Sequence, residues 1–124
     1  MSAGHTPSPK RQIADRKGRE GEAQAAQYLM QQGFEVVAQR VKTKLGEIDL
    51  IARKTGLVVF AEVKWRRRSG DLDTAIDERR LARVAAAVEV VAHEYTTGQE
   101  DIRIDVILLA PGARPRHIAN AQML

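Results

Sequence analysis

Gly46-Glu47-Ile48-Asp49-Leu50 and Phe60-Ala61-Glu62-Val63-Lys64 are the two stretches that decide the fold of this chain. Both are rich in β-branched and large apolar residues, and a turn-forming glycine lies between them, so they predict the strands of a β-hairpin. Side chains alternate between the two faces of a strand, which places Glu62 and Lys64 on one face. The hairpin would also bring Asp49 beside Glu62.

Asp49, Glu62 and Lys64 are the set of charges that metal-assisted phosphodiester hydrolysis uses. Two carboxylates a few ångströms apart repel each other unless a hard cation lies between them, and Mg²⁺ prefers carboxylate, water and phosphate oxygens. Such a cation lowers the pKa of an attacking water, while a lysine can hold the nucleophile or the scissile phosphate. We therefore expect these three residues to be catalytic, with Mg²⁺ or Mn²⁺ as the cofactor.

A second interpretation of the same residues is the solvent face of an edge strand, on which Glu62 and Lys64 form an ordinary surface pair. Apolar residues are expected to line the opposite face of both strands, which favours the catalytic interpretation. These residues are Ile48, Leu50, Ala52, Ala61 and Val63.

The chain of 124 residues is long enough for one domain with its own core. It contains no cysteine, which excludes disulfides and thiolate metal sites and is compatible with a reducing cytoplasm. We find no apolar leader in the first residues and no run of about 18 apolar residues anywhere. We therefore expect a mobile segment at residues 1–12, one domain over residues 13–124, a cytoplasmic location and no membrane partner.

The net charge of +4 is concentrated in basic clusters that suit a polyanionic partner. Phosphate backbones attract such clusters through counterion release, which needs no base readout. A solvated surface that serves solubility is the other interpretation. Trp65, which follows Lys64, could stack on a base or pack against the sheet. The residues predicted to bind nucleic acid are Lys42, Lys44, Arg66, Arg67, Arg68 and Arg80.

Two helices alternate with strands along the chain. Strong helix formers fill residues 13–32, and Gly33 is expected to end this helix. The second helix shows an apolar stripe at intervals of three and four residues up to Tyr95, with Asp73 or Thr74 as its cap. Strands are expected at residues 34–41, in the two motif stretches, at residues 102–109 and, in short form, near residues 117–118. This order predicts an α/β fold, a three-layer sandwich with a mixed central β-sheet flanked by helices.

Three further motifs accompany the two stretches, namely Gly18-x-x-Gly21-Glu22, Gly33-Phe34 and Arg103-x-Asp105-Val106-Ile107. Together they resemble the YraN-type family of small bacterial proteins, over most of the chain from Gly18 onward. That family is similar to archaeal Holliday-junction resolvases and to the wider PD-(D/E)xK nuclease superfamily. The resemblance implies a restriction-endonuclease-like core in the order α-β-β-β-α-β.

The resemblance also implies roles for single residues. Asp49 and Glu62 would be the metal ligands, with the backbone carbonyl of Val63 as a third. Lys64 would be the catalytic lysine.

Two other carboxylates match the family pattern. The resemblance implies that Glu22 reaches the metal or its water from the first helix, whereas the residues alone favour a solvated position for this side chain. Asp105 fits the pattern as well, but it could be a structural acceptor buried between the strands and the second helix. Asp105 is therefore left out of the catalytic set.

The leading hypothesis is an Mg²⁺-dependent endonuclease that acts on structured or branched DNA through a metal-activated water. A branched junction has near-twofold symmetry, so cutting both strands would favour a homodimer. Because a fold does not establish an activity, the main alternative is a nuclease-fold adaptor that binds DNA in repair or recombination without cutting it. An RNA-directed nuclease is a third hypothesis.

Overall fold

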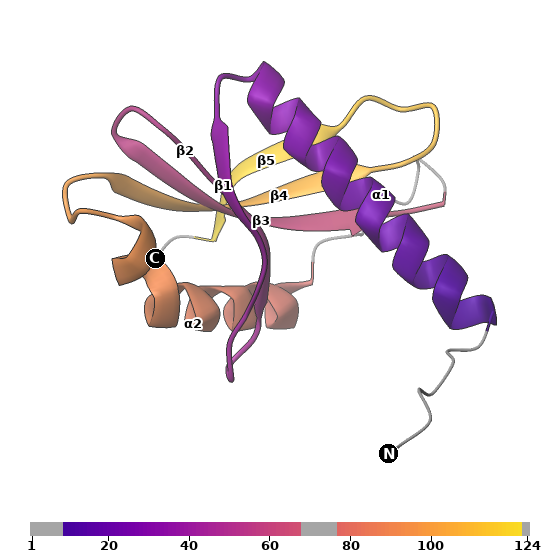
Figure 1. Ribbon diagram of the computed structural model, residues 1–124, viewed down its shortest axis with the longest axis horizontal. Coiled ribbons are helices and arrows are strands. Elements are labelled where there is room, and N and C mark those ends of the chain that lie inside the picture. Colours follow the sequence, from indigo (N-terminus) through magenta and orange to yellow (C-terminus); the bar gives the residue numbers. More distant parts are fainter. Residues whose placement is uncertain (1–8, 68–76, 123–124) are drawn as a thin grey trace, which may run out of the picture.

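The computed structural model describes residues 9–67 and 77–122, with side chains from residue 18 onward. In chain order the elements are α1 (Pro9–Gln31), β1 (Glu35–Lys42), β2 (Glu47–Lys54), β3 (Leu57–Trp65), α2 (Glu78–Tyr95), β4 (Asp101–Leu109) and β5 (Arg116–Gln122). The strands form one sheet in the order β1-β2-β3-β4-β5, in which only the β3–β4 pair is parallel. The two helices cover opposite faces of this sheet (Figure 1). The predicted three-layer α/β sandwich with a mixed sheet is confirmed.

The helix α1 ends as the sequence predicts. Gly33 follows it with a φ of +91°, a left-handed conformation that glycine adopts without the steric cost other residues incur. The helix begins at Pro9, earlier than the expected start at Ile13, because proline fits the first helical turn. Residues 1–8 of the segment expected to be mobile lie outside the described residues.

The helix α2 begins later than expected. Asp77 is its cap and accepts hydrogen bonds from the backbone nitrogens of Arg79 and Arg80, at 2.9 and 3.4 Å. The predicted caps Asp73 and Thr74 lie outside the described residues, and Asp77 takes their place as the cap of this helix. In the part of the chain that the structure describes, no helix is both long enough and apolar enough to span a bilayer.

The core consists of two apolar layers, one on each face of the sheet. The apolar stripe of α2 packs on one face, as its spacing predicts, and α1 covers the other face. The predicted alternation along β2 fails at Ile48, which packs on the α2 side, whereas Leu50 packs on the α1 side. Pairing between β2 and β3 runs from Lys54 opposite Leu57 to Leu50 opposite Ala61. The motif carboxylates therefore lie just beyond the paired stretch, where β2 departs from regular alternation.

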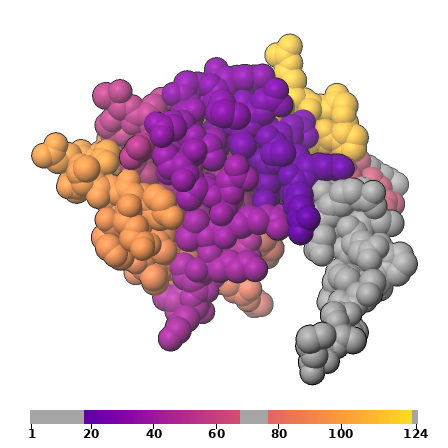
Figure 2. Space-filling view, viewed as in Figure 1, coloured from indigo at the N-terminus to yellow at the C-terminus, as the bar shows by residue number. Residues whose placement is uncertain are grey.

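The turn between β1 and β2 projects beyond α2 (Figures 1 and 2) and packs against this helix at Gly46. Inside the turn, Thr43 Oγ1 donates to the carbonyl oxygen of Gly46 at 2.9 Å and accepts from the nitrogens of Leu45 and Gly46, each at 3.1 Å. A Cβ atom on Gly46 would lie 2.7 Å from the carbonyl oxygen of Arg83 in α2. Glycine is thus required here because two backbones approach each other closely.

We expect Gly46→Ala to lower the free energy of unfolding by about 1–3 kcal/mol, because the turn must move away from α2. Gly18→Ala is the control, since a Cβ there has nothing within 4 Å and an alanine in a helix should stabilise the protein by about 0.5–1 kcal/mol. Urea denaturation of both variants checks this expectation. Equal stability of the two variants would contradict the close packing of the turn on α2.

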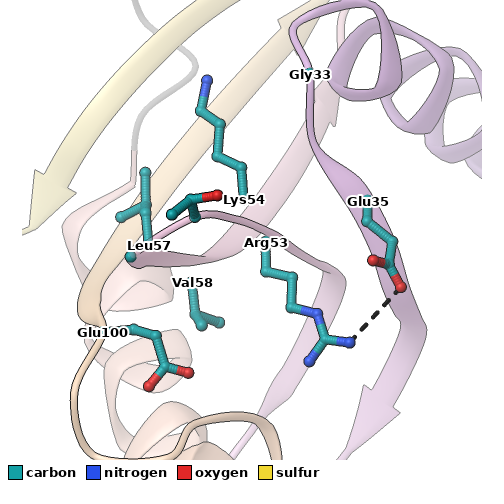
Figure 3. Close-up of a pocket in the computed structure, with 9 residues that line it drawn as sticks. Gly33, Glu35, Arg53, Lys54, Leu57, Val58 and Glu100 are labelled. Atoms are coloured by element: carbon teal, nitrogen blue, oxygen red, sulfur yellow. Dashed lines mark ion pairs between the residues drawn. The ribbon is translucent and has the colours of Figure 1, made fainter.

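A recess of about 420 Å³ lies at the β2–β3 turn, at the other end of the hairpin from the motif carboxylates (Figure 3). Its charges are mutually compensated, because Arg53 pairs with Glu35 at 3.7 Å. Lys54 donates to the carbonyl oxygen of Gln32 at 3.1 Å and lies 4.2 Å from the ring centroid of Phe34. These contacts tie the end of α1 to the hairpin, so we assign the recess a structural role.

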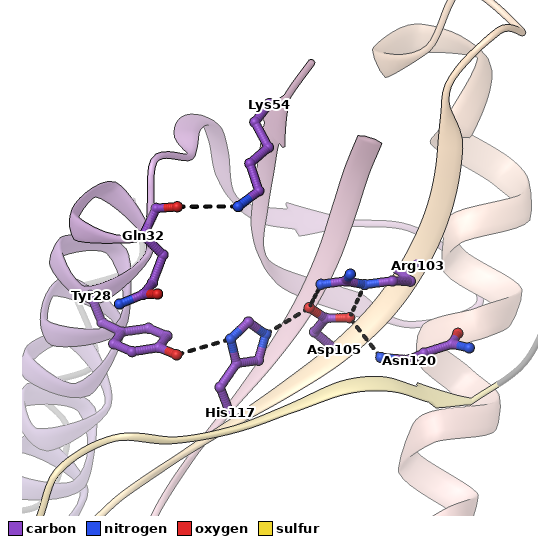
Figure 4. Close-up of polar contacts among 7 residues, drawn as sticks. All are labelled: Tyr28, Gln32, Lys54, Arg103, Asp105, His117 and Asn120. Atoms are coloured by element: carbon purple, nitrogen blue, oxygen red, sulfur yellow. Dashed lines mark hydrogen bonds and ion pairs between the residues drawn. The ribbon is translucent and has the colours of Figure 1, made fainter. Parts of the chain in front are cut away.

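Asp105 is a fully buried carboxylate that joins β4, β5 and α1 (Figure 4). Arg103 donates to both of its oxygens, at 3.1 and 2.8 Å, and the backbone nitrogen of Asn120 donates to it at 2.9 Å. His117 Nε2 lies 2.6 Å from Asp105, and His117 Nδ1 lies 3.1 Å from the hydroxyl of Tyr28. Asp105 is thus a structural acceptor as expected, but its network reaches α1 rather than α2.

Candidate active site

The hairpin brings Asp49 of β2 and Glu62 of β3 to one place in the sheet. The Oδ2 atom of Asp49 accepts a hydrogen bond from the backbone nitrogen of Val63 at 2.8 Å, which anchors this carboxylate to β3. Asp49 is 7% exposed and Glu62 is 3% exposed. The interpretation of these charges as an ordinary solvent face is therefore wrong, because such a face would be hydrated.

Lys64 shares the face of Glu62, as the strand alternation predicts. Its Nζ lies 3.7 Å from Glu62 Oε1, and its side chain is 14% exposed. Burial lowers the pKa of Lys64, and the neighbouring charge of Glu62 partly opposes this effect. The ammonium is thus held at the carboxylate pair.

Among the described residues, no cation forms an ion pair with Asp49. Burial raises the pKa of Asp49 to about 6, and the charges of Glu22 and Glu62 raise it as well. The hydrogen bond from Val63 acts in the opposite direction but does not outweigh them. A bound cation would relieve this unfavourable electrostatic state.

The negative charge of Glu22 is one of the causes that raise the pKa of Asp49. Its Oε2 accepts a hydrogen bond from Arg40 Nε at 2.6 Å, and its side chain is 13% exposed. The solvated position that the residues alone favoured is wrong. The sequence did not predict that Arg40 pairs with Glu22. Arg40 has a φ of +53°, which is rare for a residue other than glycine. The pattern of residues along the strand gives no indication of this backbone conformation.

Arg80 lies at Glu62 in this structure. Its Nε donates to Glu62 Oε1 from the first turn of α2, while 52% of the Arg80 side chain stays exposed. The predicted role of Arg80 as a nucleic-acid ligand stays a prediction, but its present partner is a carboxylate. Beside it is a recess of about 190 Å³, lined by Gly46, Glu47, Arg80, Arg83 and Val84.

The oxygen ligands of this site suit a hard divalent cation that takes only a few of its ligands from the protein. Within the described residues, no group of three or more His, Cys, Asp or Glu side chains forms a ready metal site. Mg²⁺ commonly takes one or two carboxylates and completes its shell with water and substrate phosphate, which two carboxylates satisfy. Asp49 and Glu62 would hold the cation, and the carbonyl of Val63 remains the predicted third ligand.

The predicted nucleic-acid ligands are spread over two places. Lys42 is exposed at the end of β1, and Lys44 is exposed in the β1–β2 turn. Arg66 is half-buried and donates to the carbonyl oxygen of Trp65 at 3.2 Å, whereas Arg67 is exposed. Arg68 lies outside the described residues.

Trp65 packs rather than presenting a free ring. It belongs to the apolar layer under α1, and a Cβ on Gly21 would lie 3.7 Å from Trp65 Cδ1. Of the two interpretations of Trp65, packing against the sheet is confirmed.

Comparison with known proteins places these residues in a family. The model of the Uncharacterised protein family UPF0102 matches residues 21–109, which include the carboxylates and lysine described above. The chain belongs to this family. A UPF0102 protein of Erythrobacter litoralis is 62% identical over 90% of this chain and 97% of its own length. A UPF0102 protein of Sphingopyxis alaskensis is 49% identical over 89% of this chain and 95% of its own length.

A solved structure shows the same fold. Archaeoglobus fulgidus Hjc, a Holliday junction resolvase from an archaeal hyperthermophile, aligns with a TM-score of 0.57 at 18% identity. The alignment covers 83% of this chain and 72% of the resolvase chain. The UPF0102 chain therefore has the restriction-endonuclease-like core that the motifs predicted.

Proposed function

We propose that this UPF0102 protein is a metal-dependent endonuclease acting on structured or branched DNA in the cytoplasm. The observation that carries the proposal is the buried pair Asp49 and Glu62 with Lys64 at 3.7 Å from Glu62. Burying like charges together is costly, so a site of this kind indicates a use for them beyond stability.

Each residue of the site would have a distinct role in the reaction. A divalent cation held by Asp49 and Glu62 would supply a water of lowered pKa and neutralise charge on the phosphoryl oxygens. Val63 keeps Asp49 in place through its backbone nitrogen. Lys64 presents a half-buried ammonium that can orient the scissile phosphate or the attacking water. Glu22, paired with Arg40, faces the same cluster and can accept a proton from that water.

Two observations support DNA as the substrate. Exposed lysines at positions 42 and 44 extend the positive surface along the projecting turn, which suits a phosphate backbone. The solved structure of the same fold is described as a Holliday junction resolvase, which favours branched DNA. Two cuts on a nearly twofold junction would require a homodimer, and sedimentation that finds only monomer with and without junction DNA would contradict this part.

Cleavage of labelled four-way, flap, linear duplex and single-stranded DNA, and of a matched RNA duplex, tests the proposal. We expect cleavage of branched DNA that requires Mg²⁺ or Mn²⁺ and falls by about 10²-fold or more in Lys64→Ala. Cleavage of RNA alone would favour the RNA-directed nuclease. Tight junction binding without cleavage, in every metal and unchanged in Lys64→Ala, would favour the non-cutting adaptor.

Lys42→Gln and Lys44→Gln should each reduce the slope of log affinity against log salt by about 1, because each removes one phosphate contact. The loss should be similar for every DNA sequence tested. Arg53→Gln is the matched control, since it removes one exposed positive charge at the far end of the hairpin, in a pair of 3.7 Å with Glu35. An identical slope in the wild type and the three variants would show that the β1–β2 turn does not contact DNA.

A further inference from the structure

Glu62 has two cationic partners on the same carboxylate oxygen. Arg80 Nε donates to Oε1, and Lys64 Nζ lies 3.7 Å from that atom. A carboxylate that is 3% exposed needs such partners, because an unpaired buried charge is strongly destabilising. In the absence of a metal, Arg80 therefore supplies much of the positive charge at this ligand.

Two of the three carboxylates of the site already have cationic partners without a metal. Arg40 pairs with Glu22, and both Lys64 and Arg80 pair with Glu62, whereas no ion pair reaches Asp49 among the described residues. A divalent cation at the carboxylates would add two positive charges and would compete directly for Glu62 Oε1. The added charge would repel the two cations at Glu62 and favour the release of one of them.

Arg80 is the cation best able to leave. Lys64 is 14% exposed and emerges from the sheet beside Glu62, and Arg40 is held at Glu22 at 2.6 Å. Arg80 is 52% exposed and extends from the first turn of a surface helix. Its long side chain can turn without moving the helix, and its planar guanidinium can pair with a phosphate through two donors.

The recess beside Arg80 gives the guanidinium a place to meet a substrate phosphate. It lies between the β1–β2 turn and α2, and it contains a second guanidinium, Arg83, together with one carboxylate, Glu47. A nucleic-acid phosphate there would be held by two arginines, of which Arg80 also reaches the metal ligand Glu62.

We infer that Arg80 is the counterion of Glu62 in the metal-free protein, and that a divalent cation displaces it onto a nucleic-acid phosphate beside Arg83. The inference rests on the proposed metal-dependent function and adds a coupling to it. Metal releases Arg80 for the phosphate, and a bound phosphate removes Arg80 from the metal site. By linkage, metal and nucleic acid each strengthen the binding of the other by the same factor.

Mn²⁺ binding in the absence of DNA tests the displacement, by calorimetry on the folded proteins. Arg80→Gln should bind Mn²⁺ about tenfold more tightly than wild type, because the competing cation is gone. Arg80→Lys, which keeps the charge, should stay near the wild-type affinity. Arg79→Gln is the matched control, since its residue lies in the same helical turn and shows no ion pair among the described residues.

The second arm measures the affinity for a four-way DNA junction with and without Ca²⁺. Ca²⁺ should strengthen binding to wild type and to Arg79→Gln about tenfold, and should have little effect on Arg80→Gln. Equal Mn²⁺ affinity in wild type and Arg80→Gln would overturn the inference about Arg80, but it would not contradict metal binding by Asp49 and Glu62. Absence of Mn²⁺ binding in all variants would overturn both the inference and the metal-dependent function.

Discussion

Asp49→Asn is expected to abolish metal-dependent cleavage and, at the same time, to make the metal-free protein more stable at about pH 8. Cleavage should fall by about 10³-fold or more, because the variant loses one of the two carboxylates that hold the cation. The fold should survive, since the side-chain oxygen of asparagine can still accept the hydrogen bond from Val63 that is 2.8 Å long in the wild type.

The stability gain follows from the pKa of Asp49. Burial and the nearby carboxylates raise this pKa from 3.8 to about 6 in the folded protein. Asp49 therefore binds a proton more tightly in the folded state than in the unfolded state. The stability that this proton contributes is fully present below about pH 4 and is lost as the pH rises through about 6. Above that range the charged side chain costs on the order of 3 kcal/mol, which the neutral asparagine avoids.

Thermal unfolding in the presence of a chelator measures this effect at about pH 5 and about pH 8. The stability advantage of Asp49→Asn should be larger at the higher pH. Asp101→Asn is the control, because Asp101 is exposed on β4 and its neutralisation should change little. A variant that is less stable than wild type at both pH values, or one that cleaves normally, would contradict the role assigned to Asp49.

Asp105→Asn should be among the most destabilising single changes in the chain, with no direct effect on the metal ligands. Asp105 is fully buried, and both of its oxygens accept from Arg103. Asparagine would turn an amide donor toward these donors and leave a cation in the network without its charge partner. Breaking a buried pair in this way costs about 3 kcal/mol or more.

The pH dependence of the Asp105 network has the opposite sign to that of Asp49. Burial alone would raise the pKa of Asp105, but hydrogen bonds from His117, Arg103 and Asn120 lower it to about 2. The stability that this carboxylate contributes is therefore present above about pH 4 and is lost as the pH falls toward 2. Protonation in that range removes the acceptor that joins β4, β5 and α1.

Urea denaturation at about pH 7 and about pH 3 measures this contribution, with Asp101→Asn again as the surface control. The difference in unfolding free energy between wild type and Asp105→Asn should shrink at the lower pH. A constant difference across this range would contradict ionisation of Asp105 as the source of stability.

Local patterns were sufficient to predict the sheet and the core of the site. Strand alternation placed Glu62 and Lys64 on one face, and the hairpin turn brought Asp49 next to β3. These features depend on residues close in sequence. The periodic stripe of α2 predicted which of its faces is buried, because helical geometry alone determines that face.

Other features depend on tertiary contacts that no local pattern encodes. The break in alternation at Ile48, the left-handed backbone of Arg40 and the pairing of Arg80 with Glu62 all require elements from different parts of the chain. The cap at Asp77 was missed because Asp73 and Thr74, earlier in the same polar stretch, are equally good caps by residue type. The Asp105 network could not be predicted for the same reason, because it joins β4, β5 and α1.

The central claim is that Asp49 and Glu62 share a divalent cation, and Mn²⁺ titration of ¹⁵N-labelled protein followed by NMR tests it most directly. Paramagnetic broadening should begin at the backbone amides of residues 48–50 and 61–64, and it should be absent from the same amides in Asp49→Asn. Broadening that is confined to other acidic residues, or that is unchanged in Asp49→Asn, would contradict the account.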